Sequence, residues 1–472
     1  MLYIPEYREA GEVFRFFEEI AGIPHGSGNT ALIADYLVAF AKERGLAVLR
    51  DEYDNVVIKK PATAGYESRP TVVIQGHLDM VADKTPDCTI DMEREGLELY
   101  RDGDFIRARG TTLGGDDGVA VAYALALLDS RDIPHPRLEA LFTSDEEIGL
   151  IGAGAVSPDA IEGRLLINID SDVEGIFTVG CAGGMRSDIT LPVCREAVNS
   201  GKYTLKLSGF LGGHSGVEID KGRVNAIKAL AEILSTAGNI RIASLSGGVA
   251  DNAIPKSAEC ELIAPSTELL LSAISAAKEK YRASEPEAYI SLESSGAAVS
   301  ALTARDTERV ISLLSELPSG VMAMSSDIEG LVETSLNLGI LKLTENALEA
   351  SFSVRSAVGK EKRRLGDRLR DIAAAYGADY SERGEYPAWE YRRDSQLREV
   401  MVEVYEKMYA KSPEVVIIHA GLECGILSEK FPGLDCVSIG PDNFDIHTPD
   451  EHLSISSTAR VWEYLKAVLK SI

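Results

Sequence analysis

The sequence predicts an α/β protein in which helices flank a mostly parallel central sheet and an inserted α+β domain interrupts the chain. Strand-like and helix-like patterns alternate through the first third of the chain, which is typical of a parallel sheet covered by helices. After residue 184 the strands alternate polar and apolar residues, and after residue 391 the first pattern returns. At 472 residues the chain is also long for a single domain.

The first domain is expected to begin with two helices, because apolar residues recur at helical spacing over 12–20 and 31–44. Short runs rich in apolar and β-branched residues predict strands after them. One longer, almost wholly apolar run has the length of a buried helix. The predicted strands are 56–58, 71–75, 138–143 and 165–169, and the apolar helix is 119–128.

The predicted domains are a first domain made of 1–184 and 392–472 and an inserted domain of 185–391. Alternating strands and amphipathic helices fill the insertion, with strands at 188–191, 203–207 and 347–354 and helices at 224–234 and 361–375. Residues 386–389, Tyr-Pro-Ala-Trp, mark the return to the first domain. Beyond them the sequence predicts a helix at 397–408, strands at 415–418 and 437–439, and a closing helix at 461–469.

The composition limits the classes of partner. Asp and Glu number 74 against 48 Lys and Arg, so the formal net charge is −26. Phosphate-bearing partners need a basic surface, so neither nucleic acid nor an anionic membrane is expected as the main partner. The first ten residues lack the apolar core of a signal peptide, and no run approaches the roughly 20 apolar residues of a membrane span. We therefore expect a cytoplasmic protein.

The cysteines indicate free thiols rather than a disulfide framework or a zinc finger. No pair has the C-x-x-C spacing, and thiols stay reduced in the cytosol. The six are Cys88, Cys181, Cys194, Cys260, Cys424 and Cys436. Any metal ion must then be held by His and carboxylate side chains.

Residues 72–79, Val-Val-Ile-Gln-Gly-His-Leu-Asp, form the strongest local motif. An apolar strand ends in Gly76 and then presents His77 and Asp79. In open α/β sheets, ligands bind beyond the carboxyl ends of strands. His77 is therefore a candidate metal ligand, and Asp79 is placed to fix its other ring nitrogen. A turn with two surface polar residues is the alternative, and the motif alone leaves both open.

Acidic residues also stand beside two further predicted elements. Residues 114–118, Gly-Gly-Asp-Asp-Gly, precede the apolar helix, where an Asp is ordinarily a helix cap. Glycines let the backbone approach a ligand closely, and the two oxygens of one carboxylate can bridge two cations. Residues 144–147, Ser-Asp-Glu-Glu, follow a strand as either a solvated loop or a site. In a site, one Glu can bind metal while its neighbour acts as a base.

Two more candidate ligands complete a possible metal site. Asp170 follows another apolar strand, and His447 lies on a loop before the last helix in a chain with only seven His. Five segments thus offer one candidate ligand each: His77, Asp116, Glu147, Asp170 and His447. Imidazole with carboxylate suits Zn²⁺, with Mn²⁺ or Co²⁺ as alternatives. Five ligands exceed what one tetrahedral zinc needs and suit two metals that share a carboxylate.

Through these motifs the chain resembles the M20 metallopeptidase family over its full length. Within that family it looks most like the aminoacyl-histidine dipeptidases, also called Xaa-His dipeptidase, peptidase D or carnosinase-like. The order and spacing of the motifs carry the resemblance: 76–79, 114–118, 144–149, 168–170 and 447–449, with 252–255 and 419–425 in addition. The resemblance implies a zinc-peptidase catalytic domain with an inserted lid domain. It also implies metal-dependent hydrolysis of dipeptides, including Xaa-His dipeptides such as β-Ala-His, by an enzyme that is often a homodimer.

The resemblance further implies a role for each matched residue. Five would hold two zinc ions per subunit: His77 and Asp170 on one, Glu147 and His447 on the other, and Asp116 on both. Asp79 would orient His77, and Glu146 would be the catalytic general base for a metal-activated water. Asp117 departs from the family pattern, since relatives often have Asn there, and it adds negative charge beside the metals.

Four further matched residues would bind the substrate: His214, Asn252, Arg355 and Gly421. His214 stands between glycines and is a candidate donor to the oxyanion, although the residues alone favour a surface turn. Arg355 can hold a carboxylate bidentately, which suits the free C-terminus of a dipeptide. Because three of these residues fall in the inserted domain, the domains are expected to close on the substrate.

Two other functions remain alternatives at this point. One is an M20 deacylase or aminopeptidase that acts on other small peptides, and the other is a non-catalytic metal-binding protein. The long insertion and residues 419–425 favour the dipeptidase. The adjacent Glu146 and Glu147 argue against metal binding alone, because binding needs no free base.

Overall fold

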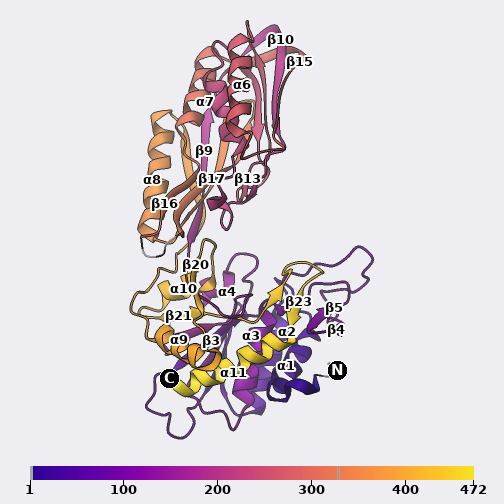
Figure 1. The fold of residues 1–472 in the computed structure, drawn as a ribbon, viewed down its shortest axis with the longest axis vertical. Helices are drawn as coiled ribbons and strands as arrows, with labels where there is room; N and C mark the ends of the chain where they lie inside the picture. The colour runs from indigo at the N-terminus through magenta and orange to yellow at the C-terminus, as the bar shows by residue number, and fades with distance from the viewer. Residues whose placement is uncertain (1–3, 327, 329) are drawn as a thin grey trace. The chain divides into compact units, whose positions relative to one another are not determined.

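The structure, a computed structural model, describes residues 4–326, 328 and 330–472 (Figure 1). The chain divides into two compact units. Unit 1 runs to Gly180 and resumes over Tyr391–Ile417 and Leu422–Ile472, and unit 2 comprises Cys181–Glu390 and Ile418–Gly421. The short segment Ile418–Gly421 therefore groups with the insertion, whereas the predicted boundaries leave it in the first domain.

An eight-stranded sheet forms the centre of the described part of unit 1, in the order β1-β2-β6-β3-β7-β21-β8-β20. Its strands are β1 (Ala47–Arg50), β2 (Val56–Lys60), β3 (Val72–His77), β6 (Leu138–Thr143), β7 (Leu165–Asn168), β8 (Ile176–Cys181), β20 (Glu414–Ile418) and β21 (Asp435–Ser438). The middle strands β6, β3, β7 and β21 run parallel, whereas β1, β2 and β8 pair antiparallel with their neighbours. The predicted α/β class is confirmed, with the parallel strands at the centre of a mixed sheet.

Helices cover this sheet, and α2, α3, α9 and α10 contact its strands directly. The helices of unit 1 are α1 (Gly11–Ala21), α2 (Ala31–Glu43), α3 (Gly115–Asp129), α4 (Ile151–Ala155), α9 (Gln396–Tyr409), α10 (Glu423–Lys430) and α11 (Ile455–Ser471), with a 3-10 turn at Pro5–Ala10. Helix α3 is the predicted apolar helix, and every residue from Val119 to Leu128 is buried. A helix that is apolar on all sides is stable only when it is surrounded by protein.

A smaller sheet of unit 1 has the order β22-β23-β5-β4. Its strands are β4 (Leu99–Asp102), β5 (Phe105–Ala108), β22 (Asn443–Phe444) and β23 (His452–Ser454). The turn between β22 and β23 carries His447, and β23 pairs with β5. The loop that bears this imidazole is therefore anchored at both ends by backbone hydrogen bonds.

Unit 2 is an antiparallel sheet with helices packed on it. In its described residues the order is β15-β10-β14-β12-β17-β18-β9-β19, with β16 beside β17. The strands are β9 (Gly183–Pro192), β10 (Arg195–Ser208), β12 (Arg241–Gly247), β14 (Ala258–Ile263), β15 (Tyr289–Leu302), β16 (Gly320–Met324), β17 (Val332–Leu343), β18 (Ala347–Ser356) and β19 (Asp379–Tyr386). A separate two-stranded ladder joins β11 (Gly213–His214) to β13 (Ala253–Ile254), and a 3-10 turn follows at Ile219–Lys221.

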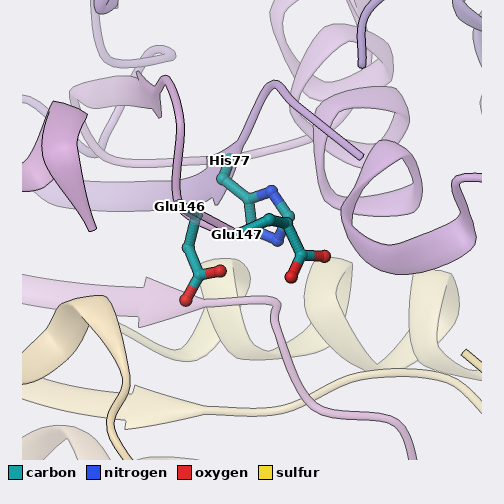
Figure 2. A group of neighbouring side chains, drawn as sticks. All are labelled: His77, Glu146 and Glu147. Atoms are coloured by element: carbon teal, nitrogen blue, oxygen red, sulfur yellow. The ribbon is translucent and has the colours of Figure 1, made fainter. Parts of the chain in front are cut away.

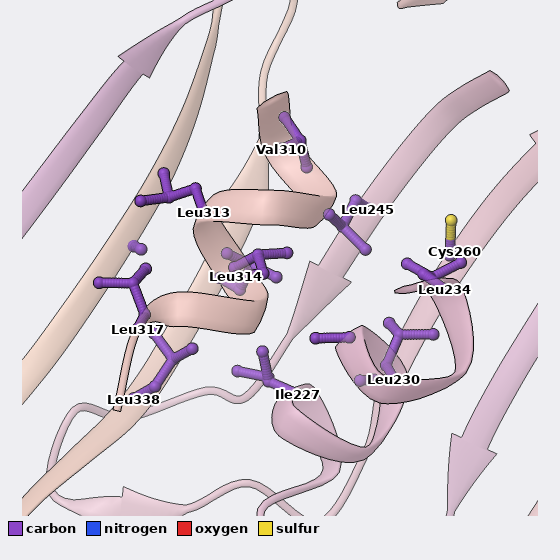
Figure 3. Packing of buried hydrophobic residues seen from close by; sticks show 14 of the residues in the cluster. Ile227, Leu230, Leu234, Leu245, Cys260, Val310, Leu313, Leu314, Leu317 and Leu338 are labelled. Atoms are coloured by element: carbon purple, nitrogen blue, oxygen red, sulfur yellow. The ribbon is translucent and has the colours of Figure 1, made fainter. Parts of the chain in front are cut away.

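The core of unit 2 lies between this sheet and its helices α5 (Ala226–Ser235), α6 (Glu268–Tyr281), α7 (Ala304–Glu316) and α8 (Gly359–Ala375). Figure 3 shows part of it, where α5, with Ile227 and Leu230, packs beside α7, with Leu314. The apolar side chains of both helices recur every three or four residues, which puts them on one face. Burial of that face against the sheet is the main source of stability for such a layer.

Every helix and strand that the sequence predicts overlaps an observed element, and α6, α7 and β15 are among the observed elements that it does not predict. Within the described residues, the structure contains no helix long and apolar enough to cross a lipid bilayer.

Candidate metal centre

Three neighbouring strands of unit 1 deliver an imidazole and several carboxylates to one edge of the sheet. His77 is the last residue of β3, and β6, its parallel neighbour, leads into Glu146 and Glu147. On the other side of β3, the strand β7 leads into Asp170. Because parallel strands all leave the sheet at the same edge, these residues meet although they are distant in sequence.

His77 is held at both ring nitrogens. Its side chain is 1% exposed, and Nδ1 lies 2.9 Å from the backbone carbonyl oxygen of Asp79. Since a carbonyl can only accept, Nδ1 carries the proton of the neutral ring. Nε2 lies 3.0 Å from Asp116 Oδ1 and 3.9 Å from Asp170 Oδ1. A ring fixed through Nδ1 with Nε2 among carboxylates has the geometry of a metal-ligating histidine.

Asp116 lies between two imidazoles. Its Oδ1 faces Nε2 of His77 at 3.0 Å, and its Oδ2 faces Nε2 of His447 at 3.1 Å. His447 Nε2 is also 2.9 Å from Glu147 Oε1. Among the described residues, two groups with ligand atoms within 4.8 Å of one another therefore share Asp116, namely His77, Asp116 and Asp170, and Asp116, Glu147 and His447. The structure thus brings all five candidate ligands together as two sets joined by one carboxylate.

Glu146 belongs to a further group with His77 and Glu147 (Figure 2). In that view the carboxylate of Glu147 lies beside the imidazole, whereas that of Glu146 is set apart on the other side. Burial raises the pKa of Glu146 to about 8, with the nearby His77 acting in the opposite direction. A carboxyl group with a pKa near neutrality can both take and return a proton at physiological pH.

The Asp79 side chain, which is predicted to orient His77, also holds the loop of the two glutamates. Its carboxylate Oδ1 lies 3.5 Å from His77 Nδ1, farther than its own backbone carbonyl. The carboxylate also accepts the backbone N–H groups of Glu146 at 2.9 Å and Glu147 at 3.3 Å, and the hydroxyl of Ser27 at 2.8 Å. One residue therefore fixes His77 through its main chain and the two glutamates through its side chain.

Asp117 is buried behind His77. Its Oδ2 accepts the backbone N–H of His77 at 3.1 Å. Burial raises the pKa of Asp117 well above its ordinary value, with His77 opposing the shift and Asp116 adding to it. A neutral carboxyl group accepts this hydrogen bond, and an Asn side chain at this position would accept it equally well.

The electrostatics of the cluster favour positive charge. Burial opposes protonation of His77, but Asp116 and Asp79 outweigh it and raise the His77 pKa well above its ordinary value. Asp116 and Glu147 raise the pKa of His447 to about 10. Among the described residues, no donor reaches the buried Oδ2 of Asp170. Carboxylates in excess and an unpaired buried oxygen fit bound cations, and this mixture of imidazole and carboxylate donors suits Zn²⁺.

The predicted substrate residues His214 and Asn252 lie side by side in unit 2. His214 of β11 pairs with Ala253 of β13, and the carbonyl of Asn252 accepts the N–H of Ser215 at 2.8 Å. His214 Nδ1 accepts backbone N–H groups two and three residues further on, at 3.2 and 3.3 Å. Burial, followed by the charge of Arg355, lowers the pKa of His214. The ring is therefore neutral, and its proton is on Nε2.

Arg355 and Gly421 meet at one tyrosine of the same unit. Arg355 Nη1 donates to the Tyr386 hydroxyl at 3.0 Å, and a Cβ on Gly421 would lie 2.8 Å from Cε2 of that ring. His419, two residues before Gly421, is hydrogen-bonded to Ser335 Oγ at 2.7 Å. Burial, followed by the charge of Arg355, lowers the pKa of His419 to about 4. The described residues thus place a guanidinium, a neutral imidazole and a glycine backbone close together.

Two buried glutamates near the metal centre are not predicted from the sequence. Glu423 accepts hydrogen bonds from Gln75 Nε2 and Thr143 Oγ1, both at 2.6 Å. Glu451 accepts four backbone N–H groups from the segment that leads into Asp116. Each lies within or just after a motif that carries the family resemblance, which is the signal that could have drawn attention to them.

Known proteins match the chain over nearly its whole length. The model of peptidase family M20/M25/M40 matches residues 73–471. The chain is 38% identical over 467 residues to the cytosol non-specific dipeptidase of Escherichia coli (strain K12), covering 97% of this chain and 96% of that protein. It is similar in structure to the aminoacylhistidine dipeptidase from Vibrio alginolyticus, with a TM-score of 0.93, 36% identity, and 98% and 96% of the two chains covered.

The aminopeptidase PepT from Bacillus cereus ATCC 10987 shares the fold, with a TM-score of 0.57, 16% identity and 98% of each chain covered. The family model spans far more than half of the sequence, and the relative at 38% identity aligns from end to end. The chain therefore belongs to peptidase family M20/M25/M40 and is a metallopeptidase, a hydrolase of peptide bonds.

Proposed function

We propose that the protein is a dipeptidase that hydrolyses Xaa-His dipeptides, including β-Ala-His, with two metal ions and Glu146 as the general base. The observation that carries the proposal is Asp116, whose two carboxylate oxygens face two different imidazoles at 3.0 and 3.1 Å. The relatives named above support dipeptides as the substrate class, because one is a non-specific dipeptidase and the other an aminoacylhistidine dipeptidase.

We assign the metals to the two sets of ligands that share Asp116. His77 and Asp170 would hold one ion, Glu147 and His447 would hold the other, and Asp116 would contribute to both. The donors are imidazole nitrogen and carboxylate oxygen, which suit Zn²⁺, with Mn²⁺ or Co²⁺ as alternatives. Bound metal ions of this kind lower the pKa of water from 15.7 to about 7 and polarise a peptide carbonyl.

Glu146 moves the proton in this proposal. Its carboxylate takes a proton from the attacking water and returns it to the nitrogen of the leaving amine. Support comes from its place beside His77 and Glu147 and from the Asp79 carboxylate, which holds its backbone N–H at 2.9 Å. Glu147, the next residue, faces His447 instead, so the two adjacent glutamates have separate tasks.

Residues of unit 2 bind the substrate. His214 carries its proton on Nε2, because Nδ1 accepts two backbone N–H groups, so the ring can donate to the oxyanion that forms at the scissile carbonyl. Arg355 pairs with the free carboxylate of the dipeptide, a contact that guanidinium makes bidentately. Asn252 and the backbone at Gly421 add polar contacts.

We place the enzyme in the cytoplasm, as the name of the Escherichia coli relative states for that protein. Its partner is a small dipeptide, neither nucleic acid nor membrane, and a homodimer is the expected assembly. The acidic composition supports the exclusion of phosphate-bearing partners.

The experiment measures zinc content together with hydrolysis of β-Ala-His, other Xaa-His dipeptides, dipeptides without His, longer peptides and N-acyl amino acids. We expect about two zinc ions per chain, turnover of dipeptides and loss of activity with a chelator. The Glu146→Gln variant should retain both metals and lose turnover, whereas Glu162→Gln, at an exposed carboxylate paired with Arg137, should behave as wild type.

Three results would contradict parts of the proposal. Turnover by Glu146→Gln would contradict the role of Glu146 as general base. Turnover of N-acyl amino acids or longer peptides in preference to dipeptides indicates a deacylase or aminopeptidase. Zinc binding without hydrolysis of any of these compounds indicates a non-catalytic metal-binding protein.

A further inference from the structure

Glu451 is a buried carboxylate that holds four consecutive backbone N–H groups of unit 1. Its side chain is only 2% exposed. Oε2 accepts from the N–H of Leu113 at 2.7 Å and of Gly114 at 2.9 Å. Oε1 accepts from the N–H of Gly115 at 2.8 Å and of Asp116 at 3.3 Å. The backbone that leads into Asp116 is therefore wrapped around one carboxylate.

The glycines of this segment allow the close approach. Gly114 has φ of +69°, and a Cβ there would lie 2.7 Å from Met80 Sδ. A Cβ on Gly115 would lie 2.8 Å from Nδ2 of Asn443, which itself donates to Glu451 Oε1 at 3.2 Å. Side chains at either position would push the backbone off the carboxylate, so the segment is shaped to this contact.

The same residue is joined to the loop of His447. Glu451 follows His447 by four residues, and its N–H donates to the carbonyl of Thr448 at 3.1 Å. Its side chain holds the segment of Asp116, and Asp116 Oδ2 in turn faces His447 Nε2 at 3.1 Å. Glu451 thus links two segments that are more than 300 residues apart in sequence, each of which supplies a candidate metal ligand.

We propose that Glu451 is a positioning residue that aims the carboxylate of Asp116 at both metal sites. To bridge two ions, the Asp116 carboxylate would have to direct one oxygen at each, and a small rotation of its backbone would withdraw one oxygen from its ion. Asp116 and Asp117 have non-helical backbone angles, so the regular helix α3 does not fix their direction. The hydrogen bonds from this segment to Glu451 fix the direction of Asp116 instead. This inference rests on the two-metal function proposed above.

A purely structural role is the competing explanation. A carboxylate at a helix start satisfies free N–H groups and stabilises the helix whether or not metal is bound. Glu139 supplies the matched comparison, because it is fully buried in β6 and accepts the N–H groups of Glu162 at 2.8 Å and Gly163 at 2.9 Å. Like Glu451 it holds consecutive backbone N–H groups, but its other oxygen faces Lys59 and Arg137, and none of these partners is a candidate ligand.

The test compares Glu451→Gln with Glu139→Gln in the full-length protein. Gln keeps the shape, but its amide nitrogen cannot accept, so one pair of N–H groups loses its partner in Glu451→Gln. In Glu139→Gln the amide nitrogen must face either the two N–H groups on Oε2 or the Lys59 ammonium on Oε1. Zinc affinity is measured by competition with a chromophoric chelator, and stability by thermal unfolding after metal removal. We expect both variants to unfold at lower temperature, and Glu451→Gln alone to bind zinc at least ~10-fold more weakly, the effect typical of residues that support metal ligands.

Wild-type zinc affinity in a folded Glu451→Gln protein overturns the proposal, and so does an equal loss of affinity in Glu139→Gln. If Glu451→Gln does not fold, Glu451→Asp takes its place, because it keeps the charge and both acceptors but retracts them by one methylene. That variant should also lose zinc affinity, and unchanged affinity there contradicts the inference. Failure of the wild-type protein to bind two zinc ions would instead refute the proposed function, independently of Glu451.

Discussion

Replacement of Asp79 by Asn tests how the loop of Glu146 and Glu147 is held. Asp79 is 1% exposed, and its Oδ1 accepts the N–H of Glu146 at 2.9 Å. Oδ2 accepts the hydroxyl of Ser27 at 2.8 Å and the N–H of Glu147 at 3.3 Å. Asn has the same shape, but only one of its two terminal atoms accepts hydrogen bonds.

The least costly orientation of the new amide faces Ser27, whose hydroxyl can turn and accept. The N–H of Glu147 then has no acceptor in a buried place, which costs about 1–3 kcal/mol. This lost hydrogen bond destabilises the conformation in which Glu147 is placed to bind metal. Because about 1.4 kcal/mol corresponds to a factor of ten, we expect zinc to bind ~10–100-fold more weakly to Asp79→Asn, with a matching loss of kcat/KM at limiting zinc.

The assay is a competition titration with a zinc chelator, followed by dipeptide hydrolysis at each free zinc concentration. The control is Asp306→Asn in unit 2, a buried carboxylate that accepts the N–H of Cys194 at 3.0 Å and the Thr303 hydroxyl at 2.9 Å. It should lower the unfolding temperature without changing zinc affinity. Wild-type zinc affinity in Asp79→Asn, or the same loss in both variants, would refute the reasoning.

Two other predictions concern the packing of Gly76 against Asp117 and the binding of the substrate by Arg355. An added Cβ at Gly76 would lie 2.5 Å from Asp117 Oδ2, so Gly76→Ala should cost about 1–3 kcal/mol of unfolding free energy and reduce zinc content, as thermal unfolding and metal analysis would show. Gly154→Ala, in open space, should do neither. Arg355→Ala should raise KM for dipeptides at least ~10-fold, because it removes a charged partner of the substrate carboxylate. In the same assay Arg383→Ala, on an exposed strand of the same sheet, should leave KM unchanged, and equal KM in both variants would exclude the proposed contact.

The five candidate metal ligands could be singled out because each lies at the end of a predicted strand or in an adjoining loop. In a parallel sheet the carboxyl ends of all strands lie at the same edge. The strands that end at His77 and just before Asp170 therefore place these two side chains together. The hydrogen-bond partners could not be predicted in this way. That the Asp79 carboxylate also holds the N–H groups of Glu146 and Glu147 could not be foreseen, because side-chain direction in a turn depends on backbone angles that no periodicity encodes.

The hydrogen-bond partners of Glu451 could not be predicted either. In the sequence it is one more acid in an acidic loop, and its partners are backbone N–H groups, which have no residue-specific signal. In unit 2, strand β15 contains several Ser and Ala residues and many of its positions are exposed, so it lacks a strand pattern. In β10 only residues 203–207 alternate clearly enough to predict a strand. Both strands form because each pairs with the other along most of its length, a tertiary effect that overrides weak local propensity.

Crystallography of the zinc-loaded protein at the zinc absorption edge tests the central claim most directly. The account predicts two anomalous peaks about 3.5–4 Å apart, with one oxygen of Asp116 on each and with His77 and His447 on different ions. A single peak, or two peaks of which only one contacts Asp116, would contradict it.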